Sequence, residues 1–300
     1  MSLASHDHKQ WPAGDQLGAG NYLTPEKRLE ALALVRQGQL FDLSHVIEHG
    51  APRFEPVQTP YVLLGAPNWQ GGVRRRRQAG ATNDAGSNLE RIEMTTHVGT
   101  HIDALGHFTI GSEMYGGNDA NEVSTDFGLL KLGIEQAPSI VSRGLLVDVS
   151  GLDGGDFLDP GRAVGPEAIE KFLAARELTL RPGDIVLINT GWGRFFMKDN
   201  PRYLSGEPGI NLAAAKWLTR QGVAAIGADN MAVEVLPGED APAIQMPVHQ
   251  HCLVEAGVYL IENLVLETLA REGIIEFCFI LLPVKFKGAT GSPARPVAMV

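Results

Sequence analysis

Three histidines and one aspartate lie within the eleven residues from 97 to 107: His97, His101, Asp103 and His107. Imidazole nitrogen and carboxylate oxygen are ligands that Zn²⁺ and Mn²⁺ readily accept. A lone histidine is more often a structural residue, but this density favours a metal centre. The sequence holds only two cysteines, neither of them in a Cys-x-x-Cys pair. Because closed structural zinc sites commonly use cysteine, we expect a site with room for water.

The spacing of these residues requires a bend in the chain. A strand rises about 3.3 Å per residue, so it would place His97 and Asp103 roughly 20 Å apart. A helix would bring together two histidines four residues apart but would turn Asp103 away from them. Gly99 and Gly106 permit unusual backbone angles. We therefore predict a strand at Arg91–Thr96 that delivers the ligands into a glycine-hinged turn.

A second group of candidate ligands lies closer to the carboxyl end. His249 and His251 are two residues apart, so on one helix they point in different directions and only one easily faces a site. Glu262 follows the apolar run Val258–Ile261. A carboxylate there is costly to bury unless it is paired or bound to metal. If this group holds a second ion, Asp103 could bridge the two.

Other residues are candidates for proton transfer and for substrate contact. An unperturbed imidazole titrates near pH 6.5, which suits a general acid and base, and we assign that role to His107, with metal ligation as the alternative. Trp192 is a candidate aromatic wall for a planar substrate, with core packing as an equal alternative, and Phe108 and Trp69 are weaker candidates for the same role. Asp229 and Glu234 follow a predicted strand, where polar groups often line a cleft. For each of them, a purely structural role agrees with the sequence at least as well as a role in a cleft.

The motif His97-x-Gly99-Thr100-His101-x-Asp103-x-x-x-His107 resembles the signature of the cyclase-like metal-dependent hydrolases, the family of kynurenine formamidase and isatin hydrolase. The resemblance covers roughly residues 38–283. One departure is Leu105, which stands where a proline is common, and it bears on pocket shape rather than on the ion. Further segments that resemble the family pattern are Asp42–His45, Asn189–Trp192, Gly227–Asp229 and Val258–Leu264.

The resemblance implies an α/β fold with a mixed β-sheet core and flanking helices, of the swivelling β/β/α-like type. It also implies a divalent ion, Mn²⁺ or Zn²⁺, one or two per subunit, and a homodimer or homotetramer. A histidine and a glutamate from the second group would complete or flank the site. We favour His249 over His251, because Pro247-Val248-His249 is closer to the family pattern. The expected metal ligands are thus His97, His101, Asp103, His249 and Glu262.

We therefore expect a metal-dependent hydrolase that opens an amide bond, in a cyclic amide or an aryl formamide, or a lactone, by a metal-activated water. A metal-dependent lyase or dehydratase acting on a small carbonyl substrate is one alternative. A non-catalytic metal-binding assembly protein is another. Serine or thiol hydrolase chemistry ranks low, because Ser44 and Cys252 have no readable triad around them.

Composition narrows the classes of partner. The 300 residues carry a formal charge of −10, which argues against nucleic acid, and 44% are hydrophobic, enough for a substantial core. No apolar run approaches the length of a membrane span, and residues 1–10 lack an apolar signal-peptide core. We expect a small-molecule substrate and a cytoplasmic location, with both cysteines as free thiols. Residues 1–37 should form an N-terminal segment with a helix, and residues 38–300 one domain.

The run Arg74–Arg77 is the local exception to the acidic charge, and it lies between glycines. We read it as a solvated surface loop. The functional alternative is a lid or subunit contact that attracts an anionic substrate. Four arginines in one run do not make a nucleic-acid face.

The remaining chain alternates helix and strand signals, as expected for an α/β fold. Thr24 and Asn211 are predicted helix caps, and Gly111–Gly117 and Gly151–Gly155 are predicted loops. The tail from Gly288 is expected to wrap a neighbour or lie on the surface. Predicted helices begin at Pro25 (ending near 38), Pro166 (near 176), Asn211 (near 222), Val248 (near 256) and Val265 (near 271). Predicted strands are 40–46, 91–96, 145–149, 185–189, 223–227, 258–261 and 275–282.

Overall fold

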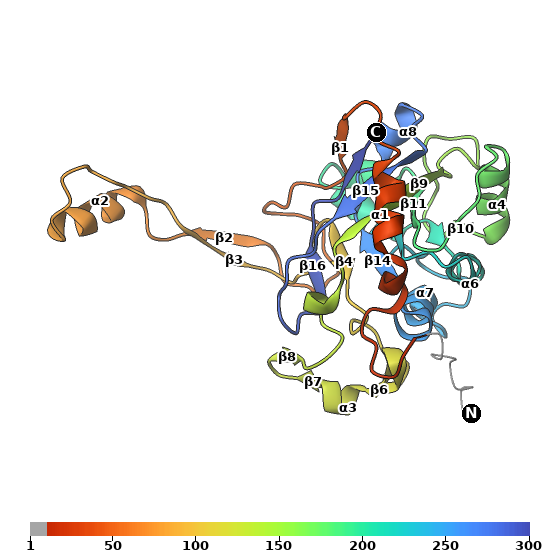
Figure 1. The fold of residues 1–300 in the computed structure, drawn as a ribbon, viewed down its shortest axis with the longest axis horizontal. Coiled ribbons are helices and arrows are strands. Elements are labelled where there is room, and N and C mark those ends of the chain that lie inside the picture. The colour runs from red at the N-terminus through yellow and green to blue at the C-terminus, as the bar shows by residue number, and fades with distance from the viewer. Residues whose placement is uncertain (1–10) are drawn as a thin grey trace.

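The computed structural model describes residues 11–300, and it is built around a nine-stranded mixed sheet (Figure 1). The order across the sheet is β1-β17-β15-β9-β11-β13-β14-β4-β16. The expected mixed α/β architecture is confirmed. In chain order the strands are β1 Leu40–Asp42, β4 His101–Asp103, β9 Ile140–Asp148, β11 Ile185–Asn189, β13 Ala225–Ala228, β14 Tyr259–Glu262, β15 Glu276–Leu281, β16 Gly291–Pro293 and β17 Val297–Met299.

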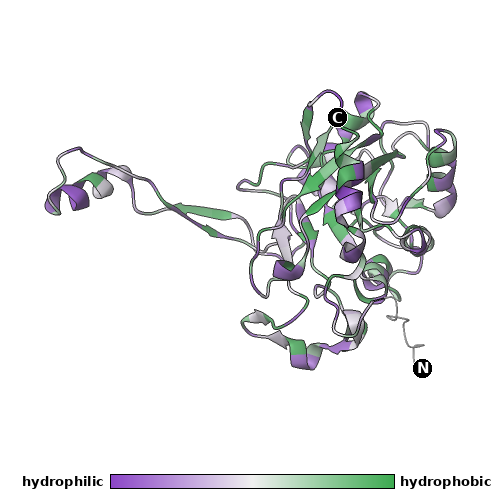
Figure 2. Ribbon diagram, in the orientation of Figure 1, coloured by the Kyte–Doolittle hydropathy of each residue, from purple (hydrophilic) through white to green (hydrophobic). Residues whose placement is uncertain are grey.

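Four central strands, β9, β11, β13 and β14, are parallel, and the strands on both sides of them are antiparallel to their neighbours. The run Ile185–Asn189 in β11 is buried along its whole length, as is β13. Strands buried on both faces read as continuous apolar runs, which is why the sequence located them well. Figure 2 shows the strands in the body of the molecule largely in green, the hydrophobic end of the scale.

Helices and short elements complete the body. α1 packs against β9 and β15, and α4 packs against α6. The helices are α1 Pro25–Leu32, α2 Trp69–Gln78, α3 Ala120–Val123, α4 Pro166–Ala174, α5 Asn200–Tyr203, α6 Leu212–Arg220, α7 Pro247–His249, a π-helix at Gln250–Ala256 and α8 Glu267–Arg271. Single 3₁₀ turns lie at Gly18–Tyr22, Tyr115–Gly117, Ile134–Gln136 and Trp192–Phe195. Two-stranded sheets pair β2 Val62–Gly65 with β3 Glu90–Glu93, β5 Glu113–Met114 with β6 Asn118–Asp119, β7 Ser124–Thr125 with β8 Gly128–Leu129, and β10 Ala163–Val164 with β12 Gly209–Ile210.

Most predicted helices and strands are present within a few residues of their expected limits. The Thr24 hydroxyl accepts from the Lys27 amide, and the Asn211 side chain accepts from the Ala214 amide, so both predicted caps are confirmed. β11 has its predicted limits. The helix expected to reach residue 38 ends at Leu32, and residues 40–46 form only the short strand β1. The glycine-rich loop at 111–117 contains β5 and a 3₁₀ turn.

The expectation for the carboxyl-terminal tail is wrong. Instead of lying on the surface, the tail adds two strands to the main sheet. β16 pairs with β4, and β17 lies between β1 and β15. Ser292 and Ala298 in these strands are fully buried. Gly/Pro-rich composition suggested a loose segment, but edge positions of a sheet tolerate proline, and β16 is an edge strand that ends at Pro293.

The prediction of a loop at Arg74–Arg77 is also wrong, because these arginines lie in α2. The Asn68 side chain caps this helix by accepting from the Gly71 amide. α2 stands at the end of an arm whose stalk is the β2–β3 hairpin, and the arm projects far from the body (Figure 1). Within residues 11–300, no helix is both long and apolar enough to cross a bilayer.

Candidate metal centre

The predicted ligands converge where β4 pairs antiparallel with β14. In this pairing His101 lies opposite Glu262. His101 and Asp103 are two residues apart on β4 and therefore share a face, while Ile102 between them points into the core. His101 and Asp103 have no exposed surface, and Glu262 is 5% exposed. Two short strands thus bring three chemically active side chains into one buried group.

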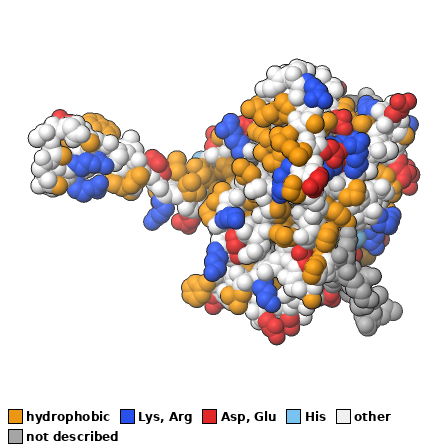
Figure 3. Space-filling view, viewed as in Figure 1, with side chains coloured by type: hydrophobic (Ala, Val, Ile, Leu, Met, Phe, Trp, Pro, Cys, Tyr) orange, Lys and Arg blue, Asp and Glu red, His pale blue; other side chains and the backbone are white. Residues whose placement is uncertain are grey.

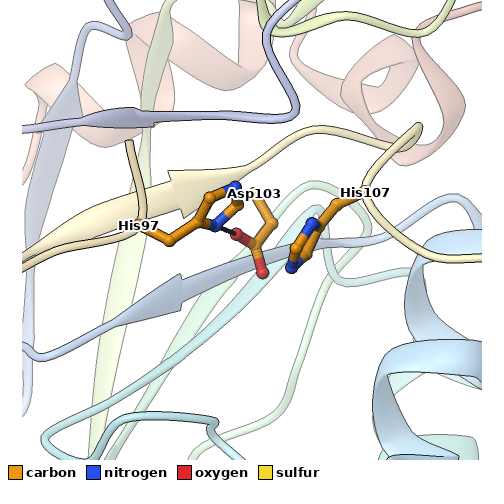
Figure 4. Close-up of side chains that lie close together, drawn as sticks. All are labelled: His97, Asp103 and His107. Atoms are coloured by element: carbon orange, nitrogen blue, oxygen red, sulfur yellow. Dashed lines mark ion pairs between the residues drawn. The ribbon is translucent and has the colours of Figure 1, made fainter. Parts of the chain in front are cut away.

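His97 reaches the same group from the turn that precedes β4. Gly99 in this turn has a φ of +70°, and a Cβ there would lie 2.8 Å from Ile47, so the predicted glycine hinge is present. His97 Nδ1 lies 2.8 Å from Asp103 Oδ1 (Figure 4). Gly106 has a different role from the one predicted: its φ is ordinary, but a side chain there would collide with Leu129.

The strand that was expected to deliver the ligands lies elsewhere. Residues 91–96 overlap β3, which belongs to the arm and not to the main sheet. The hinge at Gly99 follows the arm in the chain. His101 and Asp103 then lie on a separate strand, β4, rather than within the turn. The sequence could not show this, because β4 has only three residues and is held in place by β14 and β16, which are distant in the chain.

Distances within the group are those of a cluster that shares one centre. His101 Nε2 lies 3.2 Å from Glu262 Oε2 and 3.4 Å from Asp103 Oδ1. His249 Nε2 lies 3.1 Å from Glu262 Oε1 and 3.7 Å from Asp103 Oδ2. Ligand atoms of His97, Asp103 and His107 fall within 4.8 Å of one another, and so do those of His101, Asp103 and Glu262. Asp103 belongs to both sets.

Several polar atoms of this cluster are buried but make no hydrogen bond: His101 Nε2 and both carboxylate oxygens of Asp103. Other polar groups lie close to these atoms, but none of them forms a hydrogen bond with them. Leaving such atoms unsatisfied is costly, and more so for a charged group. Nitrogen and oxygen atoms this close to one another fit a divalent cation of the Zn²⁺ or Mn²⁺ type.

The electrostatics of the cluster also favour a cation. Burial by itself would lower the pKa of His101, but the charges of Glu262 and Asp103 raise it to about 10. His249 behaves in the same way: burial opposes its protonation, yet Glu234 and Glu262 raise its pKa to about 10. The carboxylates therefore stabilise positive charge at both rings, and a metal ion would supply that charge in place of the protons.

Of the two carboxyl-terminal histidines, the structure brings His249 to the cluster and not His251. His251 lies between Glu255, whose Oε2 is 2.6 Å from its Nδ1, and Thr219, whose hydroxyl is 2.8 Å from its Nε2. Glu234 is 1% exposed and binds His249, with Oε1 2.6 Å from Nδ1 and 3.0 Å from the backbone amide nitrogen. A carboxylate on the far nitrogen fixes the ring and its tautomer, as in many metal sites.

Supporting residues from the tail were not found from the sequence. The Thr290 hydroxyl lies 2.9 Å from His97 Nε2, and the Thr290 carbonyl accepts from the Ala104 amide. A Cβ on Gly291 would lie 2.6 Å from the His97 ring. Thr290 and Gly291 are almost two hundred residues from His97 in the chain, so only the pairing of β16 with β4 reveals their contact.

His107 stands at the border between the cluster and a cavity. Its ring stacks on His97 with centroids 4.1 Å apart, and the two rings flank Asp103 (Figure 4). Burial lowers the pKa of His107 to about 3, despite the nearby charge of Asp103, so the ring is neutral rather than poised near its ordinary pKa. Phe108 packs against both His107 and His249, with centroids 5.1 and 4.7 Å away.

The cavity beside the cluster has a volume of about 420 Å³ and a mainly apolar wall. Cluster residues His97, His107, His249 and Glu262 line it. Residues from the loop 231–247 and, near the base of the arm, Phe54 and Val57 complete the lining. Its size and lining are those of a site for a small aromatic or apolar molecule.

Two of the predicted aromatic walls are not at this cavity. Trp192 is fully buried, packs with Phe157 and Phe195, and its indole donates to the Tyr203 carbonyl. Trp69 is 54% exposed on α2 of the arm. Trp192 therefore has a packing role, because the 3₁₀ turn after Gly191 directs its ring inward. Phe108 does line the cavity.

Asp229, the other cleft candidate, is buried and does not line the cavity beside the cluster. Its carboxylate accepts from the Thr190 amide and hydroxyl and from the Gly193 amide. It therefore ties the end of β11 to the residues that follow β13.

Comparisons with known proteins identify related sequences and structures. Residues 41–235 match the family model described as "Putative cyclase". The chain is 27% identical to the kynurenine formamidase of Bacillus cereus over 210 residues, 70% of this chain and 79% of that protein. A crystal structure of a novel cyclase superposes with a TM-score of 0.85 at 31% identity, covering 98% of this chain and 99% of the other.

The fold is shared more widely. Isatin hydrolase A from Labrenzia aggregata, bound to benzyl benzoate, superposes with a TM-score of 0.66 at 20% identity and covers 92% of this chain and 98% of its own. The matched family segment contains His97, His101, Asp103 and His107, while His249 and Glu262 lie beyond it. On the strength of that match over most of its length, the chain belongs to the cyclase family.

Proposed function

We propose that this protein is a metal-dependent hydrolase that cleaves the C–N bond of a small amide, with an aryl formamide or a cyclic amide as substrate class. The observation that carries the proposal is the buried cluster of unsatisfied imidazole and carboxylate atoms at the wall of an apolar cavity. Kynurenine formamidases are relatives of the chain, and isatin hydrolases share its fold. A lactone is the next substrate class.

The residues proposed to hold the metal are His97, His101, Asp103, His249 and Glu262. The two overlapping ligand sets, which share Asp103, favour room for one or two ions per subunit. Nitrogen and oxygen ligands without thiolates suit Zn²⁺ or Mn²⁺. When bound, such an ion lowers the pKa of a water molecule and polarises a carbonyl group.

The chain itself supplies positioning and proton transfer. Glu234 holds the ring of His249, and Thr290 that of His97, so both imidazoles keep one nitrogen directed at the cluster. His107 is neutral and lines the cavity, and its ring can take a proton and return it to the leaving nitrogen. Phe108 and the apolar loop exclude water and offer a surface for an aromatic ring.

Turnover on a substrate panel tests this proposal directly. Purified protein supplied with Zn²⁺ or Mn²⁺ is assayed on aryl formamides, cyclic amides and lactones, with metal content measured on the same samples. We expect release of a new carboxylate with an amine or alcohol, and incorporation of ¹⁸O from labelled water into that carboxylate. Loss of water from the substrate would support the lyase alternative. Tightly held metal with no turnover on the whole panel would support the non-catalytic one.

We also propose that the arm contacts a second copy of this chain, in a homodimer or a homotetramer. The stalk strands β2 and β3 are largely exposed, and an isolated two-stranded hairpin is at best marginally stable in water. Leu63, Leu64 and Ile92 on the stalk and Trp69 at its end are apolar yet exposed. Burial against another molecule would remove this surface from water.

Charge favours another copy as the partner. The arm segment 66–89 holds four of the chain's 25 Lys and Arg residues and one of its 35 Asp and Glu residues. Its formal charge is therefore +3, against −13 for the rest of the chain. Figure 3 shows the basic side chains gathered at the far end of the arm. A basic arm and an acidic body attract each other between two identical molecules.

A reducing cytoplasm is the compartment we propose. Cys252 and Cys278 are both buried free thiols, and neither is part of a disulfide. Free cysteines are the usual state in that compartment.

A further inference from the structure

A second cavity, of about 540 Å³, opens at the carboxyl ends of the parallel strands β9, β11 and β13. Asp148 ends β9, Asn189 ends β11 and Asp229 follows β13, and all three line the cavity. The carboxyl edge of parallel strands is where α/β sheets commonly bind ligands. The linings of the two cavities share no described residue, so this space is distinct from the one beside the metal centre.

The inner wall of this cavity presents an unused hydrogen-bond acceptor. Asn189 is 3% exposed, and its amide nitrogen donates to Asp148 Oδ1 at 2.8 Å. That bond fixes the orientation of the amide, because the reverse orientation would set two oxygens against each other. Asn189 Oδ1 is left buried without a partner. A buried acceptor of this kind is costly unless a ligand or water satisfies it.

The chemistry around Asn189 selects a positively charged donor. The Asp148 carboxylate accepts from the amide and hydroxyl of Ser150 and from Asn189, but it has no basic partner among residues 11–300. An acceptor beside an uncompensated carboxylate favours an ammonium group over a neutral donor. His45 also lines this space, with its Nε2 buried and unpartnered and its ring stacked on Phe196 at 3.9 Å.

The remaining wall carries positive charge. Arg194, Lys198 and Arg271 line the cavity, and Arg194 Nε is buried without a partner. The acidic Asp156 and Glu267 also belong to the lining; Asp156 is 88% exposed and lies 3.9 Å from Arg194 Nη1. An unpaired guanidinium edge is a natural partner for a carboxylate.

We propose that this second cavity binds a small aminocarboxylic acid. Its ammonium group meets Asn189 Oδ1 next to Asp148, and its carboxylate meets Arg194 and Lys198. The side chains of Phe196 and Leu264 supply an apolar surface for the carbon skeleton between the two charged ends. This assignment is independent of the hydrolase activity proposed above, because it rests on residues outside the metal centre.

The test is calorimetric titration of the full-length protein with three probes: para-aminomethylbenzoate, para-methylbenzoate, which lacks the amine, and benzylamine, which lacks the carboxylate. We expect the first to bind at least about tenfold more tightly than the other two, since a charge-assisted hydrogen bond contributes on the order of 1.5–3 kcal/mol. Comparable affinity for all three probes, or no binding of the first at millimolar concentration, overturns the proposal.

Four variants locate the binding. Asn189→Leu and Lys198→Glu should each weaken binding of para-aminomethylbenzoate by about tenfold or more. Lys171→Glu on the exposed face of α4 should leave it unchanged, and so should Phe108→Ala in the metal-site cavity. Should Asn189→Leu fail to fold, as judged by circular dichroism, the exposed Lys198→Glu still decides. Loss of binding in Phe108→Ala with full binding in Lys198→Glu would place the ligand at the metal site and refute the proposal.

Discussion

The arm and the metal centre are neighbours in the sequence and opposites in the structure. The arm's strand β3 ends at Glu93, and His97 follows four residues later. Every residue of β3 is exposed, whereas His101 and Asp103 on β4 have no exposed surface at all. The cluster lies on β4, which pairs with β14 and β16 from the distant carboxyl-terminal part of the chain, while within residues 11–300 the two stalk strands pair only with each other.

The comparison shows two ways to position a side chain. At the metal centre the ligands are fixed by the sheet and by second partners such as Glu234 and Thr290, so a substitution there should change chemistry with little effect on assembly. On the arm the exposed groups have few partners within the chain, so a substitution there should change assembly and leave the metal in place. The variants below test this separation, beginning with the largest expected effect.

Asp103→Asn should have the largest effect. Asp103 is common to both ligand sets, and the substitution removes a charged ligand without changing the size of the side chain. We expect loss of most bound metal and of activity, to a level below that of any other single variant described here. Elemental analysis and turnover measured on one preparation check it.

The matched control is Glu255→Gln, which removes a carboxylate paired with His251 outside the cluster. This variant should keep its metal and its rate. Wild-type metal content in Asp103→Asn would show that the ligand assignment is wrong.

His107→Asn should come next. A positioned base contributes roughly 10²- to 10⁴-fold to rate, and we expect a loss in that range with metal and fold retained. The His251→Asn variant is the matched control, because His251 lies outside the cluster. Stoichiometric loss of metal in His107→Asn would instead identify His107 as a ligand, whereas full metal with an unchanged rate would exclude both roles.

The sequence located the residues of the cluster better than the residues that support them. Residue types and density singled out His97, His101 and Asp103, which the structure brings together, because the metal preference of a side chain can be read without its surroundings. Buried parallel strands such as β11 were found because a strand covered on both faces is apolar throughout. Thr290 and Gly291 were missed because their contact with His97 depends on which strand lies beside β4, and the local sequence does not encode strand order.

For the arm, the sequence revealed a strand but not the surroundings of that strand. The strand predicted at residues 91–96 overlaps β3, but the local sequence does not show whether either face of that strand meets the body or the solvent. The four arginines were assigned to a loop because glycines flank them, although Asn68 caps a helix there. The inward orientation of Trp192 follows from a 3₁₀ turn whose packing partners the sequence does not reveal.

Shortening the arm should separate assembly from metal binding. Gly65 pairs with Glu90 at the end of the stalk, so residues 66–89 can be replaced by Asn-Gly, which closes a two-residue hairpin. We expect light scattering to give the mass of one shortened chain, which is below the 32.3 kDa of the intact chain, with the metal content per subunit unchanged. An oligomer with the same number of subunits as wild type would show that the arm is not the contact.

A milder change tests the charge argument for the arm. Arg74→Glu combined with Arg75→Glu reverses two exposed charges and spares Arg76, which donates to the Ala85 carbonyl inside the arm. The double variant should dissociate at lower ionic strength than wild type, because added salt screens the attraction that remains.

Thr290→Val should give the smallest effect. It tests whether the contact between the Thr290 hydroxyl and His97 contributes to metal affinity. The substitution keeps the shape of the side chain and the backbone carbonyl that accepts from Ala104, but it removes the hydroxyl beside His97 Nε2. Loss of a partner on the far nitrogen of a metal ligand typically weakens metal affinity about 10- to 100-fold. Thr219→Val is a matched control, because it removes the same kind of threonine–histidine contact at His251, outside the cluster. Competition with a chelator measures both variants, and equal metal affinity in the two would show that the tail covers His97 without orienting it.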